Sequence, residues 1–589
     1  MFDNVKRLFD IPKFQLDNHP LDAAVAGKKN GQWVKYSSQK FIEQINLVSK
    51  GLLKLGLNPG DKICIISTNR PEWNFMDIGS LQVGVVVVPI YPTSSEEDYA
   101  YIMNNCEAKL VAVESEDLLQ KVNKVKDQVP SLQHIYSFEN IDNCTNFDEL
   151  LKLGEDGNQD AVDAIKEGIK EDDLATLIYT SGTTGKPKGV MLSHKNIVAN
   201  AKGSNDRFPL SRGTRALSFL PICHVYERMV SYLYMLMCTE IWYAESMETI
   251  GDNLKEVKPH VFSTVPRLLE KVYDKIVAKG QDLTGIKKAL FFWALELGLK
   301  FDIPSRTSAF YKFKLGIARK LIFSKWQEAL GGNIGIVVSG SAALQTRLAR
   351  VFNAAGIPVV EGYGLTETSP VIAVGLWKGE LFRFGTVGPA INGVEIKIAE
   401  DGEICVKGPN VMCGYYKLPE KTAEVIDEDG WFHTGDIGEL VEGKYLRITD
   451  RKKEIFKTSG GKYVAPQVIE NTFKESRFIE NLAVIGENQK FPAALLIPDF
   501  AFVRSWAKEK GITLPDSNEA LIQEQVVKDR IWKEVENQNN KFGQWERVKK
   551  ITLLPKEFSI DGGELTPTLK LRRKIILEKY RSEIEAIYS

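Results

Sequence analysis

Short, uninterrupted apolar runs constrain the fold of this chain more than any other feature. Such runs occupy 62–67, 84–90 and 109–113, and they are rich in Val and Ile. Runs of this length without polar alternation are typical of strands that are buried on both faces. Helix-like stretches accompany them, for example 39–55, which carries an apolar stripe. The pattern predicts an α/β fold with a parallel sheet.

Length and charge limit the class of protein. The 589 residues suffice for two or three large cores. Apolar residues make up 43% of the chain and charged residues 26%, so a disordered or fibrous protein is excluded. The formal net charge of −1 creates no global basic field, and we expect no nucleic-acid partner.

The cysteines and the apolar runs indicate a compartment. Seven cysteines, none with C-x-x-C spacing, argue against a disulfide framework and a structural zinc site. They favour a reducing, cytoplasmic location. The first residues lack a continuous apolar core, so we expect no secretory signal. The run 85–90 is far shorter than the ~20 residues that cross a bilayer, and we expect no membrane-spanning segment.

The pattern of predicted secondary structure changes twice in the second half of the sequence. From about 381, short strand-like segments alternate with Gly, Asn and Pro turns, which predicts a β subdomain over 381–449. After Asp450, strand-like segments alternate with long charged helices. We therefore expect one domain over 1–449 and a second over 450–589.

The segment 179–189 (YTSGTTGKPKG) follows a strand-like run and combines three glycines with four hydroxyl side chains and two lysines. Glycines let backbone N–H groups turn inward, and the lysines add positive charge, so the segment suits a polyphosphate. It is not a Walker A loop, because Lys186 is followed by Pro187. A flexible linker would not need this combination. The predicted phosphate-binding residues are Thr180, Ser181, Gly182, Thr183, Thr184, Gly185 and Lys188.

This segment resembles the phosphate loop of the adenylate-forming superfamily, which contains acyl-CoA synthetases, luciferases and peptide-synthetase adenylation domains. The resemblance implies a large N-terminal domain of two parallel-type sheets with flanking helices and a small β subdomain. It also implies a smaller, mobile α+β C-terminal domain that rotates about a hinge at Asp450.

The segment 361–368 (EGYGLTET) resembles the second nucleotide motif of the superfamily. Tyr363 offers an aromatic face for adenine, Thr366 a donor for the α-phosphate, and Glu367 a hard carboxylate for Mg²⁺. Glu361 and Gly362 belong to the same motif. The resemblance places Gly340 and Ser341, in the turn 339–344, at the adenine edge, although an ordinary strand-to-helix turn explains that turn equally well.

The segment 431–436 (WFHTGD) resembles the ribose motif. A carboxylate can accept two hydrogen bonds from a vicinal diol, which suits Asp436 to both ribose hydroxyls. Arg451 adds a second ribose contact with a permanent charge. The local alternative is an ordinary Gly-Asp turn.

Cys223 and His224 are adjacent. We do not interpret them as a thiol nucleophile and its base, because adjacent residues on a strand point to opposite faces. The resemblance instead places His224 beside the acyl-adenylate and the thiol path, where a role as base for the thiol is one hypothesis.

The segment 565–574 (LTPTLKLRRK) resembles the loop that carries the adenylation lysine, which is Lys570 here. The superfamily often has Gly before this lysine, whereas Leu569 precedes it here, as in long-chain members. The alternative is a solvated basic run. After rotation, the resemblance implies that the C-terminal domain presents a coenzyme A path of Lys457, Gly460, Gly461 and Lys462.

The segment 265–274 (VPRLLEKVYD) resembles the gate of long-chain fatty acyl-CoA synthetases, with Val265, Pro266 and Arg267 as gate residues. The implied reaction joins a fatty acid to coenzyme A (CoA), with ATP as second substrate and Mg²⁺ as cofactor. The alternatives are a fatty acyl-AMP ligase that loads an acyl carrier protein, a luciferase-type oxygenase, and a non-catalytic fatty-acid or nucleotide sensor.

The segment 310–326 mixes lysines with Phe, Leu, Ile and Trp. A basic amphipathic helix can lie on an anionic membrane, so this segment is a candidate for peripheral contact with the inner face of a membrane. The alternative is a surface helix packed on the core. An oligomer such as a dimer is compatible with the sequence.

Overall fold

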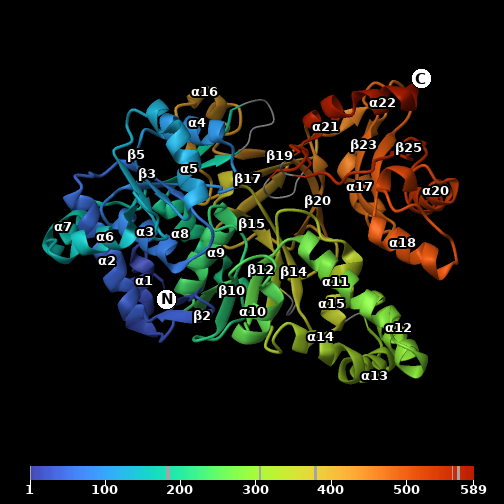
Figure 1. Cartoon of the computed structure of the whole chain (residues 1–589), viewed down its shortest axis with the longest axis horizontal. Coiled ribbons are helices and arrows are strands. Elements are labelled where there is room, and N and C mark those ends of the chain that lie inside the picture. The colour runs from blue at the N-terminus through green and yellow to red at the C-terminus, as the bar shows by residue number, and fades with distance from the viewer. Residues whose placement is uncertain (1, 181–185, 304–306, 377–380, 560–561, 567–570) are drawn as a thin grey trace. The chain divides into compact units, whose positions relative to one another are not determined.

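The computed structural model describes residues 2–180, 186–303, 307–376, 381–559, 562–566 and 571–589 (Figure 1). It divides into two compact units. The first unit comprises Met1–Lys397, Cys405–His433 and Glu442–Leu446, and the second comprises Ile398–Ile404, Thr434–Val441 and Arg447–Ser589. No helix of the described residues is long and apolar enough to cross a membrane.

One eight-stranded sheet of the first unit has the order β18-β9-β8-β4-β3-β5-β6-β7. The strands from β8 to β7 are parallel, and β9 and β18 continue the sheet in antiparallel pairs. The apolar runs of the sequence form its centre. The strands are β3 Lys62–Ile66, β4 Val86–Ile90, β5 Ala108–Val113, β6 His134–Ser137, β7 Thr145–Asn146, β8 Leu174–Thr180, β9 Lys188–Ser193 and β18 Gly414–Tyr415.

The other eight-stranded sheet has the order β15-β14-β13-β12-β10-β11-β1-β2 and is parallel except for its two outermost pairs. The expected two parallel-type sheets are therefore confirmed. Its strands are β1 Val25–Lys29, β2 Gln32–Tyr36, β10 Arg215–Ser218, β11 Glu240–Tyr243, β12 Val261–Thr264, β13 Ile336–Ser339, β14 Val359–Gly364 and β15 Val371–Val374.

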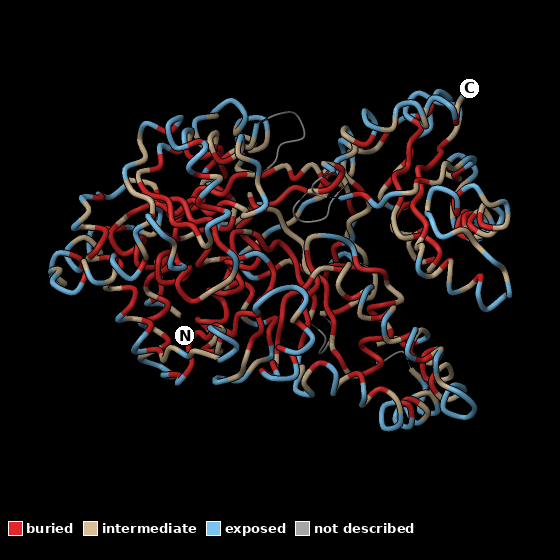
Figure 2. The backbone as a smooth tube through the Cα atoms, in the orientation of Figure 1, coloured by how far each residue is buried: buried red, intermediate tan, exposed pale blue. Residues whose placement is uncertain are grey.

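Helices α3 and α8 each contact both of these sheets, and α9 packs on β10 and β11 and reaches β8 through a hydrogen bond from Arg228 to the Thr176 hydroxyl. Every residue of α3 and α9 is buried (Figure 2). Helix α2 shows how local sequence defines an outer helix: the Ser37 side chain accepts a hydrogen bond from the Lys40 N–H, and the stripe Phe41, Ile45, Val48 and Leu52 is buried. The α-helices of the first unit are α1 Asp10–Asn18, α2 Ser38–Lys54, α3 Pro71–Gln82, α4 Glu96–Cys106, α5 Glu116–Val125, α6 Phe147–Glu155, α7 Gln159–Gly168, α8 His194–Ser204, α9 Val225–Leu236, α10 Ile250–Val257, α11 Pro266–Gln281, α12 Gly285–Leu299, α13 Ala309–Ala318, α14 Ser324–Ala329, α15 Thr346–Ala354 and α16 Pro419–Ala423.

The segment expected to form a β subdomain contains a four-stranded sheet of order β16-β17-β19-β20. The division between the two units falls within this stretch of chain rather than at one residue. Its strands are β16 Glu395–Ile398, β17 Glu403–Lys407, β19 Phe432–Val441 and β20 Tyr445–Arg451.

The second unit has an α+β core around a three-stranded sheet, β23-β24-β25, in which β23 and β24 are antiparallel and β25 is parallel to β24. Alternate residues of the strands face opposite ways: Leu482 and Leu496 pack with Ile531 of α20, whereas Leu495 packs with Ile576 of α21. The elements are β21 Phe456–Lys457, β22 Tyr463–Val464, β23 Ile479–Ile485, β24 Ala493–Pro498, β25 Lys550–Leu553, α17 Pro466–Phe473, α18 Phe500–Glu509, α19 Asn518–Leu521, α20 Gln525–Asn539, α21 Arg573–Lys579 and α22 Arg581–Tyr588.

Candidate active site

The predicted phosphate segment connects two antiparallel strands. Thr180 ends β8 and pairs with Lys188 at the start of β9. The hairpin thus brings together the two ends of the glycine-rich segment. Lys188 extends its Nζ to 4.5 Å from the ring centroid of Tyr415. The residues Ser181, Gly182, Thr183, Thr184 and Gly185 lie outside the described residues.

Glu367 lies in the short 3-10 helix η5, Thr366–Thr368. The Tyr415 hydroxyl donates a hydrogen bond of 2.8 Å to Glu367 Oε1. Burial, with a contribution from the adjacent Glu367 carboxylate, raises the pKa of the Tyr415 hydroxyl, so it remains a donor at neutral pH. Tyr415 therefore joins two predicted residues, Lys188 and Glu367, in one cluster. Neither spacing nor motif in the sequence pointed to Tyr415.

Two buried amides hold the turn that carries Glu367. Asn200 Nδ2 donates to the carbonyls of Val371 (2.7 Å) and Thr368 (3.2 Å). Asn410 Nδ2 donates to the same Thr368 carbonyl at 3.0 Å. Asn410 Nδ2 also donates to the Val371 carbonyl at 3.3 Å, so each of the two buried carbonyls accepts from both amides, and only the loss of both amides would leave these acceptors unsatisfied. Asn200 and Asn410 thus fix the turn from two distant parts of the chain, and sequence reasoning missed both.

The predicted adenine and gate residues lie at the carboxyl ends of three neighbouring parallel strands, β12, β13 and β14. Thr264 is level with Ser339, and Ser339 is level with Glu361. The Gly340 N–H donates to the Thr264 carbonyl at 3.0 Å. Ligands of open α/β sheets bind outside the carboxyl ends of the strands, so this edge is a suitable place for a nucleotide.

Glu361 supports the neighbouring turn. Its carboxylate accepts a hydrogen bond of 3.1 Å from the Leu344 N–H, and burial raises its pKa to about 7. Ser341 has a positive φ of 70°, a backbone region that costs free energy for a residue other than glycine. A Cβ on Gly340 would come within 3.0 Å of the Tyr226 ring. The turn is therefore held in a strained, tightly packed conformation.

Tyr363 and Gly362 continue β14 beyond Glu361 and pair with β15, Tyr363 opposite Ala373. The Tyr363 ring is half-buried. The predicted gate begins α11: Val265 is its N-cap residue and Pro266 its first residue. Arg267 forms an ion pair with Glu270, whose other oxygen accepts a hydrogen bond of 2.9 Å from Gln345.

His224 is the N-cap residue of α9, and its Nδ1 accepts a hydrogen bond of 3.1 Å from the Tyr226 N–H. The premise that Cys223 and His224 lie on a strand is wrong, because residues 222–223 form a turn before the helix. The thiol of Cys223 is buried, and burial raises its pKa, so it is a poor nucleophile. A neutral His224 ring with Nδ1 as acceptor carries its proton on Nε2.

The second unit contains the predicted ribose pair. Arg451 Nε donates a hydrogen bond of 3.1 Å to Asp436 Oδ1. Asp436 is buried, and its backbone N–H bonds to the Thr434 hydroxyl at 3.1 Å. The carboxylate is therefore held in position by the arginine that the sequence assigned to the same ligand group.

The predicted hinge residue Asp450 is also buried in the second unit. Its carboxylate accepts hydrogen bonds from the backbone N–H of Arg451 (2.6 Å) and from that of Gln467 (3.2 Å) in the first turn of α17. Burial, reinforced by the charges of Glu470 and Glu454, raises the pKa of Asp450 to about 7. Asp450 thus links β20 to α17 through its side chain.

The predicted coenzyme A path forms the hairpin β21–β22. The Thr458 N–H donates to the Lys462 carbonyl at 2.9 Å, and Gly461 has a φ of 78°. Lys457, Gly460, Gly461 and Lys462 are all exposed. Lys570 lies outside the described residues.

Comparison with known proteins decides the family. The family described as AMP-binding enzyme matches residues 13–416, and its C-terminal domain matches residues 453–589. The chain belongs to the AMP-binding enzyme family. This assignment agrees with the superfamily expected from the glycine-rich segment.

Curated relatives of this AMP-binding enzyme match over nearly its whole length. Long-chain-fatty-acid–CoA ligase FadD15 of Mycobacterium tuberculosis is 34% identical over 565 residues, which are 95% of this chain and 93% of that protein. Long-chain-fatty-acid–CoA ligase 1 of Homo sapiens is 35% identical over 602 residues, covering 95% of this chain and 82% of that one.

Solved structures show the same fold. The anthranilate CoA ligase AuaEII in complex with anthranoyl-AMP has a TM-score of 0.72 at 18% identity, covering 99% of this chain and 98% of that one. A Mycobacterium tuberculosis fatty acyl CoA synthetase has a TM-score of 0.65 at 19% identity, covering 99% of both chains.

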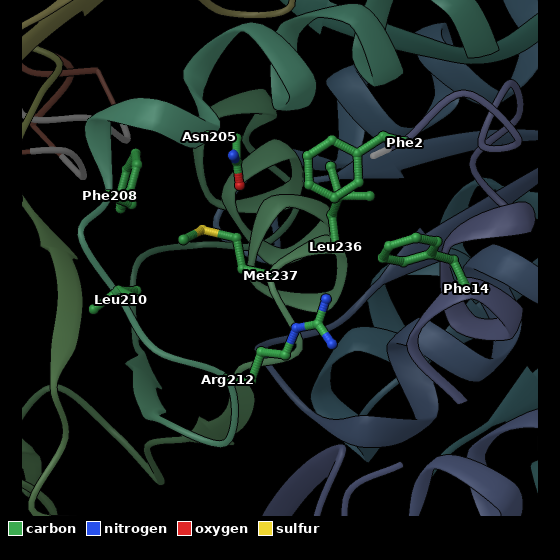
Figure 3. Close-up of a pocket in the computed structure, with 8 residues that line it drawn as sticks. All are labelled: Phe2, Phe14, Asn205, Phe208, Leu210, Arg212, Leu236 and Met237. Atoms are coloured by element: carbon green, nitrogen blue, oxygen red, sulfur yellow. The ribbon is translucent and has the colours of Figure 1, made fainter. Parts of the chain in front are cut away.

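A pocket of about 210 Å³ in the first unit of this AMP-binding enzyme is separate from the predicted site residues (Figure 3). Its lining includes Phe2, Phe14, Phe208 and Met237, with Arg212 at its side. None of these residues belongs to a nucleotide or gate motif, and we assign the chemistry to the strand edge and the Tyr415 cluster instead.

Proposed function

We propose that this AMP-binding enzyme is a long-chain fatty acid–CoA ligase. It would convert ATP, a fatty acid and CoA to acyl-CoA, AMP and pyrophosphate through an acyl-adenylate. The observation that carries the proposal is the Lys188–Tyr415–Glu367 cluster at the end of the phosphate hairpin. The names of the curated relatives, which match nearly the full chain, support the choice of acid and acceptor.

In the first step, the fatty-acid carboxylate attacks the α-phosphorus of ATP and expels pyrophosphate. Charge gathers on the phosphate oxygens, so the protein contributes mainly positioning and charge neutralisation. Lys188 supplies a cation beside the hairpin, Thr366 a donor to the α-phosphate, and Lys570 a bridge between the acid oxygen and that phosphate.

The Glu367 carboxylate fits the expected Mg²⁺. One oxygen is bound to Tyr415, and Oε2 makes no hydrogen bond to the described residues. Mg²⁺ typically combines one or two protein carboxylates with substrate phosphates and water. When bound, the ion would neutralise phosphate charge. Tyr415 would keep the carboxylate pointed toward it.

In the second step, the CoA sulfur bonds to the carbonyl carbon of the adenylate, the bond to the AMP phosphate oxygen breaks, and the thiol proton is released to solvent as AMP leaves. The hydrogen bond to Nδ1 favours an Nε2 proton on His224, so we assign His224 a donor role toward the adenylate rather than that of the thiol base. Rotation of the C-terminal domain about Asp450 would move Lys570 out of the active site and bring the hairpin of Lys457 to Lys462 into it. Two adjacent glycines there allow a close approach of the pantetheine arm.

The proposal also includes a cytoplasmic enzyme on the inner face of a membrane, able to form a dimer. The described charge pattern of α13 supports the membrane contact, and the surface is derived in the next subsection. Seven free cysteines agree with a reducing compartment.

The test is a pair of half-reactions. Purified enzyme with Mg²⁺ should exchange labelled pyrophosphate into ATP only when a fatty acid is present. It should then form a thioester with free CoA across a series of chain lengths, with a maximum at long chains. Absence of acid-stimulated exchange for every aliphatic acid would overturn the proposal. Exchange with thioester formation only on an acyl carrier protein would replace CoA by the carrier-loading alternative.

A further inference from the structure

Exposed apolar side chains form a stripe along α13 and the π-helical turn η4, Arg319–Phe323, that continues it. The stripe residues are Phe310, Phe313, Ile317 and Leu321. Their spacing of three or four residues puts them on one face of the helix. The two phenylalanines are each 67% exposed, whereas Leu315, Ala318 and Phe323 on the other face are buried. The segment therefore has two apolar faces, one packed on the core and one exposed to solvent.

The exposed hydrophobic side chains of this protein are not evenly distributed over its surface. Ten large hydrophobic side chains are strongly exposed in the described chain, and half of them lie between residues 286 and 321. The fifth is Ile286 in the first turn of α12, which is 79% exposed. The helices α12, α13 and α14 lie together at one end of the first unit (Figure 1). Gathered exposed apolar groups of this kind mark a binding surface.

Within its own segment the stripe is accompanied by charges of one sign. Residues 307–325 include five Lys or Arg and no Asp or Glu. None of Lys312, Lys314, Lys320 and Lys325 forms an ion pair with another described residue. Lys314 extends its Nζ to 4.3 Å from the ring centroid of Phe310. Lysine stems can lie along an apolar surface while the charged ends reach outward, so the cations flank the stripe rather than interrupt it.

We propose that this surface, Phe310, Phe313, Ile317 and Leu321 with the surrounding lysines, docks on an anionic lipid membrane. The apolar stripe would enter the boundary between headgroups and acyl chains, and the lysines would bind lipid phosphates. Charge complementarity selects this occupant: each lysine is available for an external anion, and a lipid surface supplies anions on both sides of an inserted stripe.

The inference rests on the surface of the first unit and not on acid activation. Its biochemical benefit does rest on the proposed function, because a bilayer is where long-chain fatty acids partition. A docked enzyme would therefore be bound to the membrane in which its fatty-acid substrate is concentrated.

The experiment is flotation of the full chain with phosphatidylcholine vesicles that contain or lack phosphatidylglycerol. We expect the parent to float with anionic vesicles at low salt and to be released as salt screens the lysines. The F310S/F313S variant should lose membrane affinity by about tenfold or more, because two inserted aromatic side chains are removed. The K312Q/K320Q variant should weaken binding to anionic vesicles and flatten the salt dependence.

Matched controls separate this surface from general effects. Met247→Ser removes another strongly exposed side chain (53%) of the first unit, and K508Q/K510Q removes two exposed lysines elsewhere; both should float like the parent. Circular dichroism and thioester formation from a water-soluble acid without vesicles verify that each variant is folded. All the changed side chains are exposed, so unchanged spectra are expected.

Failure of the parent to float with anionic vesicles would overturn the inference, as would equal flotation of F310S/F313S and parent. Binding of the stripe to an acidic protein without vesicle retention would also overturn it. An enzyme that floats but forms no acyl-adenylate would leave the docking surface standing and remove only the proposed function.

Discussion

The Tyr415 hydroxyl lies 2.8 Å from Glu367 Oε1, and the same phenol ring lies 4.5 Å from Lys188 Nζ. One side chain from β18 thereby connects the expected metal ligand with the phosphate hairpin. We expect Tyr415→Phe to lower kcat/KM for adenylation by about tenfold, since a hydrogen bond to a charged group is worth about 1.5–3 kcal/mol. Pyrophosphate exchange at several Mg²⁺ concentrations measures this decrease in kcat/KM. Part of the lost activity should be recovered at high Mg²⁺.

The neighbouring Tyr416 provides the control, because its ring lies near Lys62 and Lys417 rather than Glu367. Tyr416→Phe should retain parental exchange. Equal rates for Tyr415→Phe and the parent would show that the Tyr415 hydroxyl does not position Glu367.

Lys570→Ala should cripple adenylation but largely spare thioester formation from a supplied acyl-adenylate. The assigned bridge between the acid oxygen and the α-phosphate exists only in the first half-reaction. Pyrophosphate exchange and single-turnover thiolation, measured on the same preparation, test the difference. Lys574→Ala, an exposed lysine four residues on, is the matched control. A comparable loss in both half-reactions would contradict the role.

Asp450→Pro should leave acyl-AMP formation intact and block thioester formation, because proline fixes φ at the residue assigned as the hinge. Asp450→Ala removes the hydrogen bonds to Arg451 and Gln467 but keeps the backbone free. We expect the alanine variant to form acyl-CoA at a measurable rate. If alanine blocks thiolation as fully as proline does, the carboxylate rather than the backbone rotation is responsible.

Glu227 on α9 is fully buried, and Oε2 has no hydrogen-bond partner among the described residues. Burial raises its pKa to about 8, while the unfolded chain ionises near its ordinary value. The folded pKa is the higher one, so this contribution to stability is complete below about pH 4.5 and is lost as pH rises to about 8.

The glutamine of Glu227→Gln cannot ionise. The free energy of unfolding of the variant minus that of the parent should therefore increase by about 1–3 kcal/mol between pH 5 and pH 8. Urea unfolding at a series of pH values measures the gain. Glu328→Gln, at an exposed position, should follow the parent at every pH. A pH-independent difference between Glu227→Gln and the parent would mean that Glu227 is ionised in the folded protein.

Sequence by itself determined the strands and the family. The runs at 62–67 and 84–90 are buried on both faces in β3 and β4, as expected from their lack of polar alternation. The glycine-rich segment identified the superfamily because its combination of residue types is local and long. Asp436 and Arg451 were assigned to one ligand group from two motifs, and the structure joins them at 3.1 Å.

Only the tertiary structure decided which side chains complete the site. Tyr415 is 48 residues from Glu367, and Asn410 is 42 from Thr368, so no local pattern relates them. His224 was placed on a strand because adjacency alone does not reveal a helix N-cap. Periodicity and motifs report the few neighbours of a residue along the chain, whereas hydrogen bonds across sheets depend on how distant strands pack. The phosphate segment could therefore be predicted from the sequence, whereas the contacts of Tyr415 with Lys188 and Glu367 could not.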